Sequence, residues 1–470
     1  MNRQRELVKN TLILSIGTFL PKFTVLLTIP IITSNLTKVE YGTYDFVLTL
    51  VSLLLPIVTF QIHSAAFRFL IDCRDNPQEK KSVISNIYAF ILPVAIITLI
   101  ILYFFLSDVE PITRLLIATY FFVDILSVAT KQVVRGLSNN KLFSVGSALQ
   151  SFCNLILVFF TVSIIRLKLN GVLVSLIVAT IIELGVFVLG ANLIKEVNFK
   201  LFDLTVIKKM LNYSWPMIPN TLSMWVLSVS DRFVLKGFIG LEAVAVYAAA
   251  NKIPQIFTSV QSTFIFAWQE NASLAISDED VEKYYSDIFD KIFCILAGTM
   301  AMLIGATPIL FWLLIKGDYA DAYSQMPILF MGMLFSALSS FLGGIYVAHK
   351  RTKNVGITTM IAACCNLLVD FMLVRSIGVY AASISTLVSY FLLTIYRMKD
   401  VKNFQSISYK YVKIILCLLV LVAMCVLCCV NAFIINVINM SFGCIFALLL
   451  NRKIVIGIIH TLKHRIEKLW

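Results

Sequence analysis

The sequence predicts an all-α integral membrane protein with about 14 transmembrane helices. The helices are expected to form two six-helix lobes, related by a pseudo-two-fold axis along the membrane normal, and two further C-terminal helices. Composition is the first observation, because 59% of the 470 residues are hydrophobic and 14% are charged. Soluble domains average about 45–50% apolar and 25% charged residues. The second observation is that apolar stretches of about 20 residues, the length that crosses a bilayer, recur from end to end. A water-soluble globule is excluded.

Polar residues punctuate the apolar stretches and so define the individual spans. Each window is bounded by charged residues, prolines or glycines, which are costly inside a lipid-facing helix. The predicted spans are 10–34, 42–64, 83–106, 113–134, 142–165, 171–194, 212–235, 241–267, 286–314, 325–348, 355–374, 378–396, 411–431 and 433–450.

Basic residues predict the orientation of these spans. Of the 39 Lys and Arg residues, 29 lie in or beside the segments that face inward if the N-terminus is cytoplasmic, and 7 lie in or beside the outer segments. Cytoplasmic loops carry an excess of Lys and Arg. Both termini are therefore predicted to be cytoplasmic. The net charge of +13 is mostly this topological signal, so no nucleic-acid partner is expected.

The chain divides into five predicted regions. The segment between the lobes and the C-terminal tail both place apolar residues at helical spacing opposite several lysines. Such amphipathic helices lie on the anionic inner leaflet of a bilayer, so both regions are expected to anchor the protein there. The regions are an N-terminal lobe (1–194), an amphipathic linker (195–211), a C-terminal lobe (212–396), two additional spans (397–450) and the amphipathic tail (451–470).

The two halves resemble each other. Cys153-Asn154-Leu155 matches Cys365-Asn366-Leu367, and at a shift of about 203 residues Tyr44 falls on Tyr247. A repeat of six spans preserves membrane orientation. Parallel repeats of this kind are typical of transporters, which place the substrate between the halves.

Polar residues follow one face of the second predicted span and of its equivalent in the second half. In the second span they recur at steps of four and three residues, which keeps them on one helical face: Asp45, Thr49, Ser52, Pro56, Thr59 and His63. In the eighth span Lys252, Gln255, Ser259 and Ser262 show the same spacing, and the 203-residue shift carries them onto Thr49, Ser52, Pro56 and Thr59.

Basic residues inside the spans suggest an anion site. Lys22 and Lys252 lie near the predicted middle of the bilayer, where a lysine that faces lipid costs at least about 2.5–3.5 kcal/mol. With Arg232 they predict a hydrated cavity with a cationic lining, suited to phosphate or pyrophosphate. The alternative is that these cations pair with acidic residues and merely tie helices together. The predicted substrate-binding residues are Lys22, Arg232, Lys252, Gln255, Thr49 and Ser52.

Four carboxylates inside the spans could exchange a proton or hold a sodium ion during a transport cycle. The ion-coupling candidates are Asp45, Asp124, Glu183 and Asp231. No metal site is predicted, because the ten cysteines lie mostly in apolar runs without nearby His or acidic ligands. No catalytic residue and no cofactor are expected.

Two motifs resemble those of Wzx-type polysaccharide flippases, which belong to the multidrug/oligosaccharidyl-lipid/polysaccharide exporter superfamily. They are the Pro30-Ile31-Ile32 to Tyr44 stretch and the Asp231-Arg232-Phe233 to Lys252 stretch. The resemblance covers essentially the whole chain, but Ala245 stands where the family usually has glycine. It implies a transporter that flips an undecaprenyl-pyrophosphate-linked oligosaccharide across the bacterial cytoplasmic (inner) membrane by alternating access, driven by a proton or sodium gradient. Its motif positions are Asp231, Arg232, Tyr247 and Lys252.

The resemblance also implies partners and leaves the product open. The lipid bilayer, a polysaccharide polymerase and a chain-length regulator are the expected partners, and the glycan serves a capsule, an O-antigen or another exopolysaccharide. A multidrug exporter of the same superfamily is one rival, although the intramembrane cations argue for an anionic substrate. A membrane glycosyltransferase or polysaccharide polymerase is the other, although the predicted outer loops are short. No nucleotide-binding glycine motif is present, which argues against direct use of ATP.

The predicted cationic cavity can be tested with two substitutions. Lys22→Ala and Lys252→Ala are each expected to abolish or sharply reduce surface polysaccharide, because each removes a charge that would hold the pyrophosphate. Polysaccharide is measured alongside the amount of protein in the membrane, which should not change. Normal polysaccharide in both variants would rule the cationic cavity out.

Overall fold

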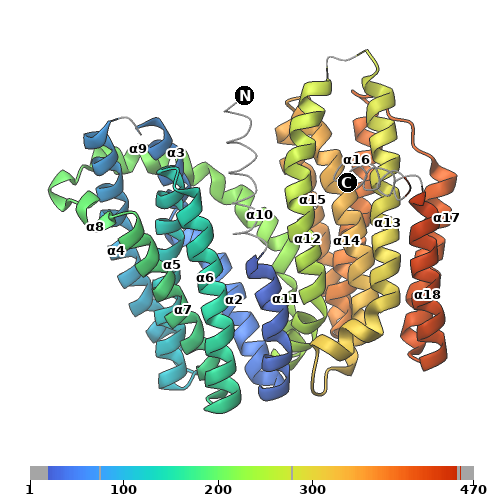
Figure 1. Ribbon diagram of the computed structural model, residues 1–470, viewed down its shortest axis with the longest axis horizontal. Helices are drawn as coiled ribbons and strands as arrows, with labels where there is room; N and C mark the ends of the chain where they lie inside the picture. The colour runs from blue at the N-terminus through green and yellow to red at the C-terminus, as the bar shows by residue number, and fades with distance from the viewer. Residues whose placement is uncertain (1–19, 74–75, 277–278, 453–455, 457–470) are drawn as a thin grey trace, which may run out of the picture. The chain divides into compact units, whose positions relative to one another are not determined.

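The computed structural model describes residues 20–73, 76–276, 279–452 and 456, and all regular structure in this part of the chain is helical (Figure 1). Within the described ranges, eleven helices are long and apolar enough to cross a membrane. The all-α membrane fold is thus confirmed. The eleven are α2 (Lys38–Val58), α4 (Pro77–Phe105), α5 (Pro111–Gly136), α6 with η1 (Asn140–Ile164), α7 (Lys168–Gly190), α13 (Val281–Leu314), α14 (Ala320–Ala348), α15 (Thr352–Ile377), α16 (Tyr380–Val401), α17 (Tyr411–Val430) and α18 (Phe433–Leu450).

The other three predicted spans also fall on helices. The first corresponds to a helix whose described part is 20–35. The seventh corresponds to two short helices, α10 (Ile218–Val229) and α11 (Asp231–Phe238), and the eighth to α12 (Leu241–Ala275). Together with the eleven, these account for the 14 predicted spans. Most of the predicted tail, 451–470, lies outside the described residues.

The chain forms two compact units that divide between Trp225 and Val226, inside α10. This division lies beyond residue 211, where the sequence places the end of the linker. Two hydrogen bonds hold the first turns of α10 within the first unit. The Gln61 amide donates to the Thr221 hydroxyl, and Trp225 Nε1 donates to Ser52 Oγ at 3.0 Å.

Helix bounds agree with the internal repeat. In the first unit α2 and α3 (Ile62–Asp72) together run from Lys38 to Asp72, and in the second unit α12 runs from Leu241 to Ala275. Both ends therefore differ by 203 residues, as the sequence motifs indicate. The important difference is continuity: α12 is one helix, although Pro254 lies inside it, whereas its counterpart breaks between Val58 and Ile62.

The α2–α3 break has an identifiable local cause. Pro56 cannot donate a backbone hydrogen bond near the end of α2, and Phe60 and Gln61 follow in the left-handed region at φ 48° and 53°. Neither residue is glycine, so this backbone conformation is strained and needs support from its surroundings. Ser214 supplies part of that support, because its hydroxyl donates to the Phe60 carbonyl at 2.8 Å.

The linker packs against the first unit through buried amide contacts. It comprises α8 (Leu193–Glu196), η2 (Phe199–Leu201) and α9 (Leu204–Ser214). Asn86 of α4 is fully buried; its side chain donates to the Leu201 carbonyl at 3.0 Å and accepts from the Asp203 N–H at 2.7 Å. Five large apolar side chains between residues 193 and 204 remain exposed, as expected for a segment on a membrane surface: Ile194, Phe199, Leu201, Phe202 and Leu204.

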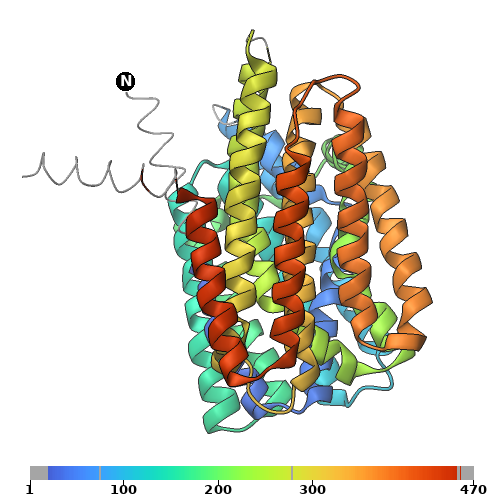
Figure 2. The same cartoon turned by 90° about the vertical axis from the view of Figure 1, so that its right-hand side faces the viewer.

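In the second unit, α14 is the most buried helix, and α17 and α18 lie against α13 (Figure 2). Asp290 of α13 accepts from the ammonium groups of Lys410 and Lys413 at 2.9 and 2.8 Å, which joins α13 to the start of α17. Small residues allow α13 and α18 to approach closely. A Cβ atom at Gly443 would lie 2.6 Å from the Ala301 carbonyl oxygen, so only glycine fits there.

This close approach can be tested by enlarging two glycines. Gly443→Leu is expected to destabilise the protein by about 1–3 kcal/mol, because a larger side chain must push α18 away from α13. Gly185→Leu in α7 is the matched control, since a Cβ at Gly185 would meet no atom within 4 Å. The midpoint of thermal unfolding in detergent measures both variants. Equal midpoints would mean that α18 does not depend on this contact.

Candidate functional site

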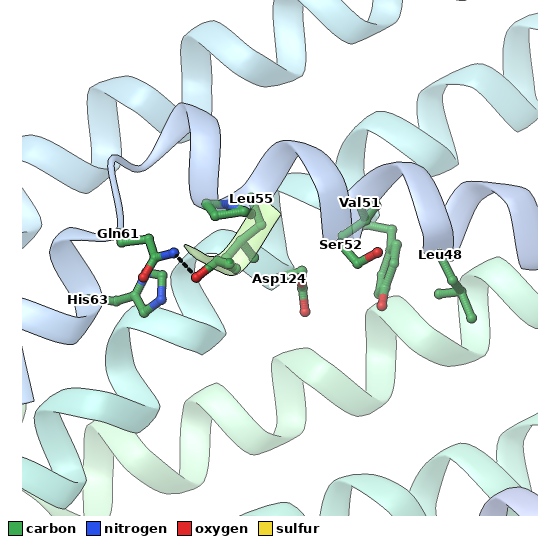
Figure 3. A pocket seen from close by; sticks show the side chains of 10 residues that line it. Leu48, Val51, Ser52, Leu55, Gln61, His63 and Asp124 are labelled. Carbon is green, nitrogen blue, oxygen red and sulfur yellow. Dashed lines mark hydrogen bonds between the residues drawn. The ribbon is translucent and has the colours of Figure 1, made fainter. Parts of the chain in front are cut away.

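The first unit contains a cavity of about 530 Å³, here called the α2–α5 cavity (Figure 3). Its walls come from α2, the α2–α3 break, the start of α3, α5 and α10. Polar and apolar side chains are mixed, which is typical of pockets that orient a small ligand. The lining residues are Leu48, Val51, Ser52, Leu55, Pro56, Gln61, His63, Tyr120, Asp124 and Thr221.

Hydrogen bonds fix most of the polar lining. Ser52 Oγ donates to the Thr49 carbonyl at 2.7 Å and accepts from Trp225. Gln61 is fixed through Thr221, and His63 Nδ1 lies 3.5 Å from Thr59 Oγ1. These side chains are therefore held in place before any ligand arrives.

Asp124 differs from the rest of the lining. It lies one helical turn after Tyr120 on α5 and is half-buried. Its carboxylate makes no hydrogen bond or ion pair with any residue in the described part of the chain. Of the four carboxylates singled out from sequence, Asp124 alone lines the α2–α5 cavity. Its oxygens are available to a ligand.

Glu183 is engaged in an ion pair. Its carboxylate is 0% exposed, lies 3.0 Å from Lys131 Nζ and accepts from the Ser127 hydroxyl at 2.8 Å. The face of α5 that carries Tyr120, Asp124, Ser127 and Lys131 is thus divided between two tasks. Its first half lines the cavity, and its second half neutralises Glu183. For Glu183 the geometry corresponds to the alternative in which opposite charges tie helices together.

The polar face of α2 is only partly directed at the cavity. Ser52 and Pro56 line it, and His63 does so from the start of α3, whereas Asp45 and Thr49 are each 3% exposed and are not part of the lining. Thr49 donates to the Asp45 carbonyl at 2.9 Å within its own helix. A shared helical face therefore does not place all of these residues at one site, because hydroxyl groups in a span are also satisfied by the preceding turn.

The second unit holds a buried polar cluster around Asp231, at the start of α11. Its carboxylate oxygen Oδ2 accepts from the Tyr247 hydroxyl at 2.6 Å and from the Thr386 hydroxyl at 3.1 Å. On α15, Asn366 accepts from Ser230 at 3.4 Å and donates to Ser385 at 3.3 Å. Helices α11, α12, α15 and α16 all contribute to this cluster.

Asp370, one turn after Asn366 on α15, belongs to the same cluster. It is 0% exposed and lies close enough to Asp231 for the two carboxyl groups to interact electrostatically. Neither Asp370 oxygen has a hydrogen-bond partner among the described residues. Sequence reasoning missed Asp370. The available signal was the pairing of Asn366 and Asp370 at four-residue spacing in an otherwise apolar span.

The predicted cationic residues differ in their access to solvent. Lys22 is exposed, Lys252 and Gln255 are half-buried on α12, and Arg232 is only 2% exposed. The Arg232 guanidinium lies 5.3 Å from the centre of the Tyr247 ring, so this arginine is part of the packing around Asp231. Ser259 and Ser262 have no described side chain.

Comparison with known proteins shows the family of this chain and its fold. A family described as "Polysaccharide biosynthesis protein" matches residues 7–268, more than half of the chain. No curated protein matches the sequence significantly. Three solved structures illustrate the fold. A multidrug resistance MATE family transporter of the MOP superfamily, inward-facing, is 12% identical over 83% of this chain and 98% of its own, with a TM-score of 0.70.

The second structure is the lipid II flippase MurJ in an inward closed conformation. It is 14% identical, covers 95% of this chain and 100% of its own, and has a TM-score of 0.66. A MOP superfamily transporter from Pyrococcus furiosus, described as having a binding pocket of reverse polarity, is 12% identical over 84% of this chain and 95% of its own, with a TM-score of 0.57. At these identities the likeness establishes the transporter fold.

The buried ion pair can be tested by removing one or both charges. Lys131→Met is expected to destabilise the protein by about 3–5 kcal/mol, because it leaves the Glu183 charge buried without its partner. The double variant Lys131→Met/Glu183→Leu should recover most of that loss. Asp72→Ala, which removes the exposed Arg68–Asp72 pair, should change stability by no more than about 1 kcal/mol. Denaturant unfolding measures all three. A double variant no more stable than Lys131→Met would show that the pair does not matter.

Proposed function

Because the chain belongs to the polysaccharide biosynthesis protein family, we propose that it is a flippase for an undecaprenyl-pyrophosphate-linked oligosaccharide. It would move the repeat unit from the inner to the outer leaflet of the bacterial cytoplasmic membrane by alternating access, with both termini cytoplasmic. The observation that carries this proposal is the family match combined with the fold of a lipid II flippase over 95% of the chain. A polysaccharide polymerase and a chain-length regulator would act on the product.

The α2–α5 cavity supports a hydrophilic substrate. The cavity lies along the helices predicted as the second and fourth spans. Polar residues inside a membrane are costly, so a polar cavity there is expected to serve a function. Carbohydrates present many hydroxyl groups that need partners when they leave water. Ser52, Gln61 and Asp124 offer such partners in fixed positions.

Ion coupling is proposed for the buried carboxylates Asp231 and Asp370. Arg232 can balance the charge of one of these two carboxylates, so the second needs a proton or an added cation to stay buried. Both Asp370 oxygens and Asp231 Oδ1 are buried without a hydrogen-bond partner among the described residues, and oxygen is the ligand type that hard cations bind. A sodium ion or a proton that binds there from one side of the membrane would favour one conformation over the other.

A multidrug exporter remains the second candidate, and one observation favours it. Asp124 is an available carboxylate in a cavity that could equally attract an organic cation. The two functions predict different effects on the cell when the protein is lost. Loss of a flippase causes lipid-linked repeat units to accumulate in the inner leaflet and surface polysaccharide to disappear, while drug susceptibility stays constant. Increased drug susceptibility with normal polysaccharide would instead establish the exporter.

The coupling site can be tested with isosteric substitutions. Asp231→Asn and Asp370→Asn are each expected to reduce gradient-driven translocation at least about tenfold, because a neutral amide cannot replace the charge that binds the cation. Asp108→Asn, in an exposed turn, is the matched control and should retain full activity. Uptake of a fluorescent lipid-linked glycan into proteoliposomes is measured under a sodium or a proton gradient. Unchanged gradient dependence in both variants would remove these residues from coupling.

A further inference from the structure

The α2–α5 cavity differs in charge from the cation-lined site that a pyrophosphate group requires. None of its ten described lining residues is a lysine or an arginine. Lys131, on the same helix as Asp124, acts on Asp124 electrostatically but forms its ion pair with Glu183 at 3.0 Å, so its charge is shared with that carboxylate. Asp124 is left as an acidic group without an ion-pair partner in the described chain. A phosphate or a carboxylate that entered this space would be repelled.

We propose that the α2–α5 cavity is a glycan-binding subsite that accepts uncharged or amine-bearing sugar rings and rejects acidic sugars and phosphate groups. The proposal rests on the proposed function, because it assigns the sugar part of the lipid-linked substrate to this cavity. The pyrophosphate must then be held elsewhere.

The shape of the lining suits a sugar ring. A pyranose has an apolar face of C–H groups and an edge of hydroxyl groups. The cavity offers Tyr120 with Leu48, Leu55 and Pro56 to the first, and Ser52, Gln61 and Asp124 to the second. In Figure 3 Asp124 lies between the Gln61–His63 pair and Ser52. The volume of about 530 Å³ falls in the usual range for small-ligand pockets.

Because the neighbouring polar side chains are held in place, Asp124 determines which ligand charges the cavity accepts. Ser52 is held by Thr49 and Trp225, and Gln61 by Thr221, so neither can turn away from an unfavourable ligand. A carboxylate without protein donors gains hydrogen bonds from sugar hydroxyls, and more from a sugar ammonium group. An acidic sugar adds a second negative charge beside it. Discrimination therefore depends on one residue.

The backbone conformation at Gln61 supports a specialised role for the α2–α3 break. Gln61 reaches the cavity from a left-handed conformation that costs on the order of 1 kcal/mol or more. The equivalent helix of the second unit, α12, is continuous and has no such break. The α2–α3 break is therefore not a requirement of the repeated fold, and it places an amide group where a ligand can meet it.

The test uses free disaccharides and the purified full-length protein, so that binding is separated from translocation. The probes share one linkage and carry a neutral, an amino or a uronic acid sugar at the non-reducing end; inorganic pyrophosphate and tetraphenylphosphonium are added as competitors. Saturation-transfer NMR reports binding. Trp225, which is bonded to Ser52, provides a fluorescence change at the cavity. We expect the neutral and amino probes to bind at least about tenfold more tightly than the uronic acid probe.

Variants assign the selectivity to the cavity. Asp124→Asn should bring the uronic acid probe within about threefold of the neutral one and remove the advantage of the amino probe. Leu48→Trp should fill the cavity and abolish binding of all three without removing a polar group. Asp108→Asn is the control and should behave as the unaltered protein.

Several results would overturn the subsite. The first is that no disaccharide binds, and the second is that the uronic acid probe binds the unaltered protein as tightly as the neutral probe. The third is that pyrophosphate competes with the sugars, and the fourth is that Asp124→Asn leaves the selectivity unchanged. Displacement of the sugars by tetraphenylphosphonium alone would indicate a drug site. Failure of the flippase proposal looks different, because a protein that binds the sugars selectively yet moves no lipid-linked glycan in proteoliposomes keeps the subsite and loses the function.

Discussion

Hydrocarbon offers no hydrogen-bond partner, so a helix that breaks inside a membrane needs protein groups to satisfy its backbone. The α2–α3 break shows how this chain meets that requirement. Ser214 donates to the Phe60 carbonyl, and Gln61 donates its amide to Thr221. Ser214 lies just before α10, and Thr221 lies in the first turn of α10. The position of the segment that holds Ser214 and Thr221, the strained backbone at residues 60 and 61 and the lining of the α2–α5 cavity therefore depend on one another.

The two units show how a repeated scaffold acquires different sites. The α2–α3 segment and α12 occupy equivalent positions 203 residues apart, but the break and its cavity are found in the first unit. The buried Asp231–Asp370 cluster is found in the second, with Asn366 at the position that matches Asn154. A duplicated set of helices provides the framework, and a few polar residues give each copy its own chemistry.

Much of the fold can be predicted from the sequence, because a membrane helix requires an apolar stretch long enough to cross the bilayer. The polar residues were harder to assign. Helical spacing placed Ser52 and Asp124 near a site, yet it also grouped Thr49 with them, which bonds to its own helix. Arg232 and Glu183 carry charges that the sequence reports, but only the structure shows that both are enclosed. The break at Phe60 has no glycine to signal it, and tertiary hydrogen bonds hold it.

Charge balance distinguishes the buried acidic residues from one another. Glu183 is matched by Lys131, so it can remain charged in every conformation that keeps the pair together. Asp231 has two hydroxyl donors and the Arg232 guanidinium close enough to balance its charge, whereas Asp370 has no described hydrogen-bond donor. The second carboxyl group of the pair is therefore the one that would need an added proton or cation.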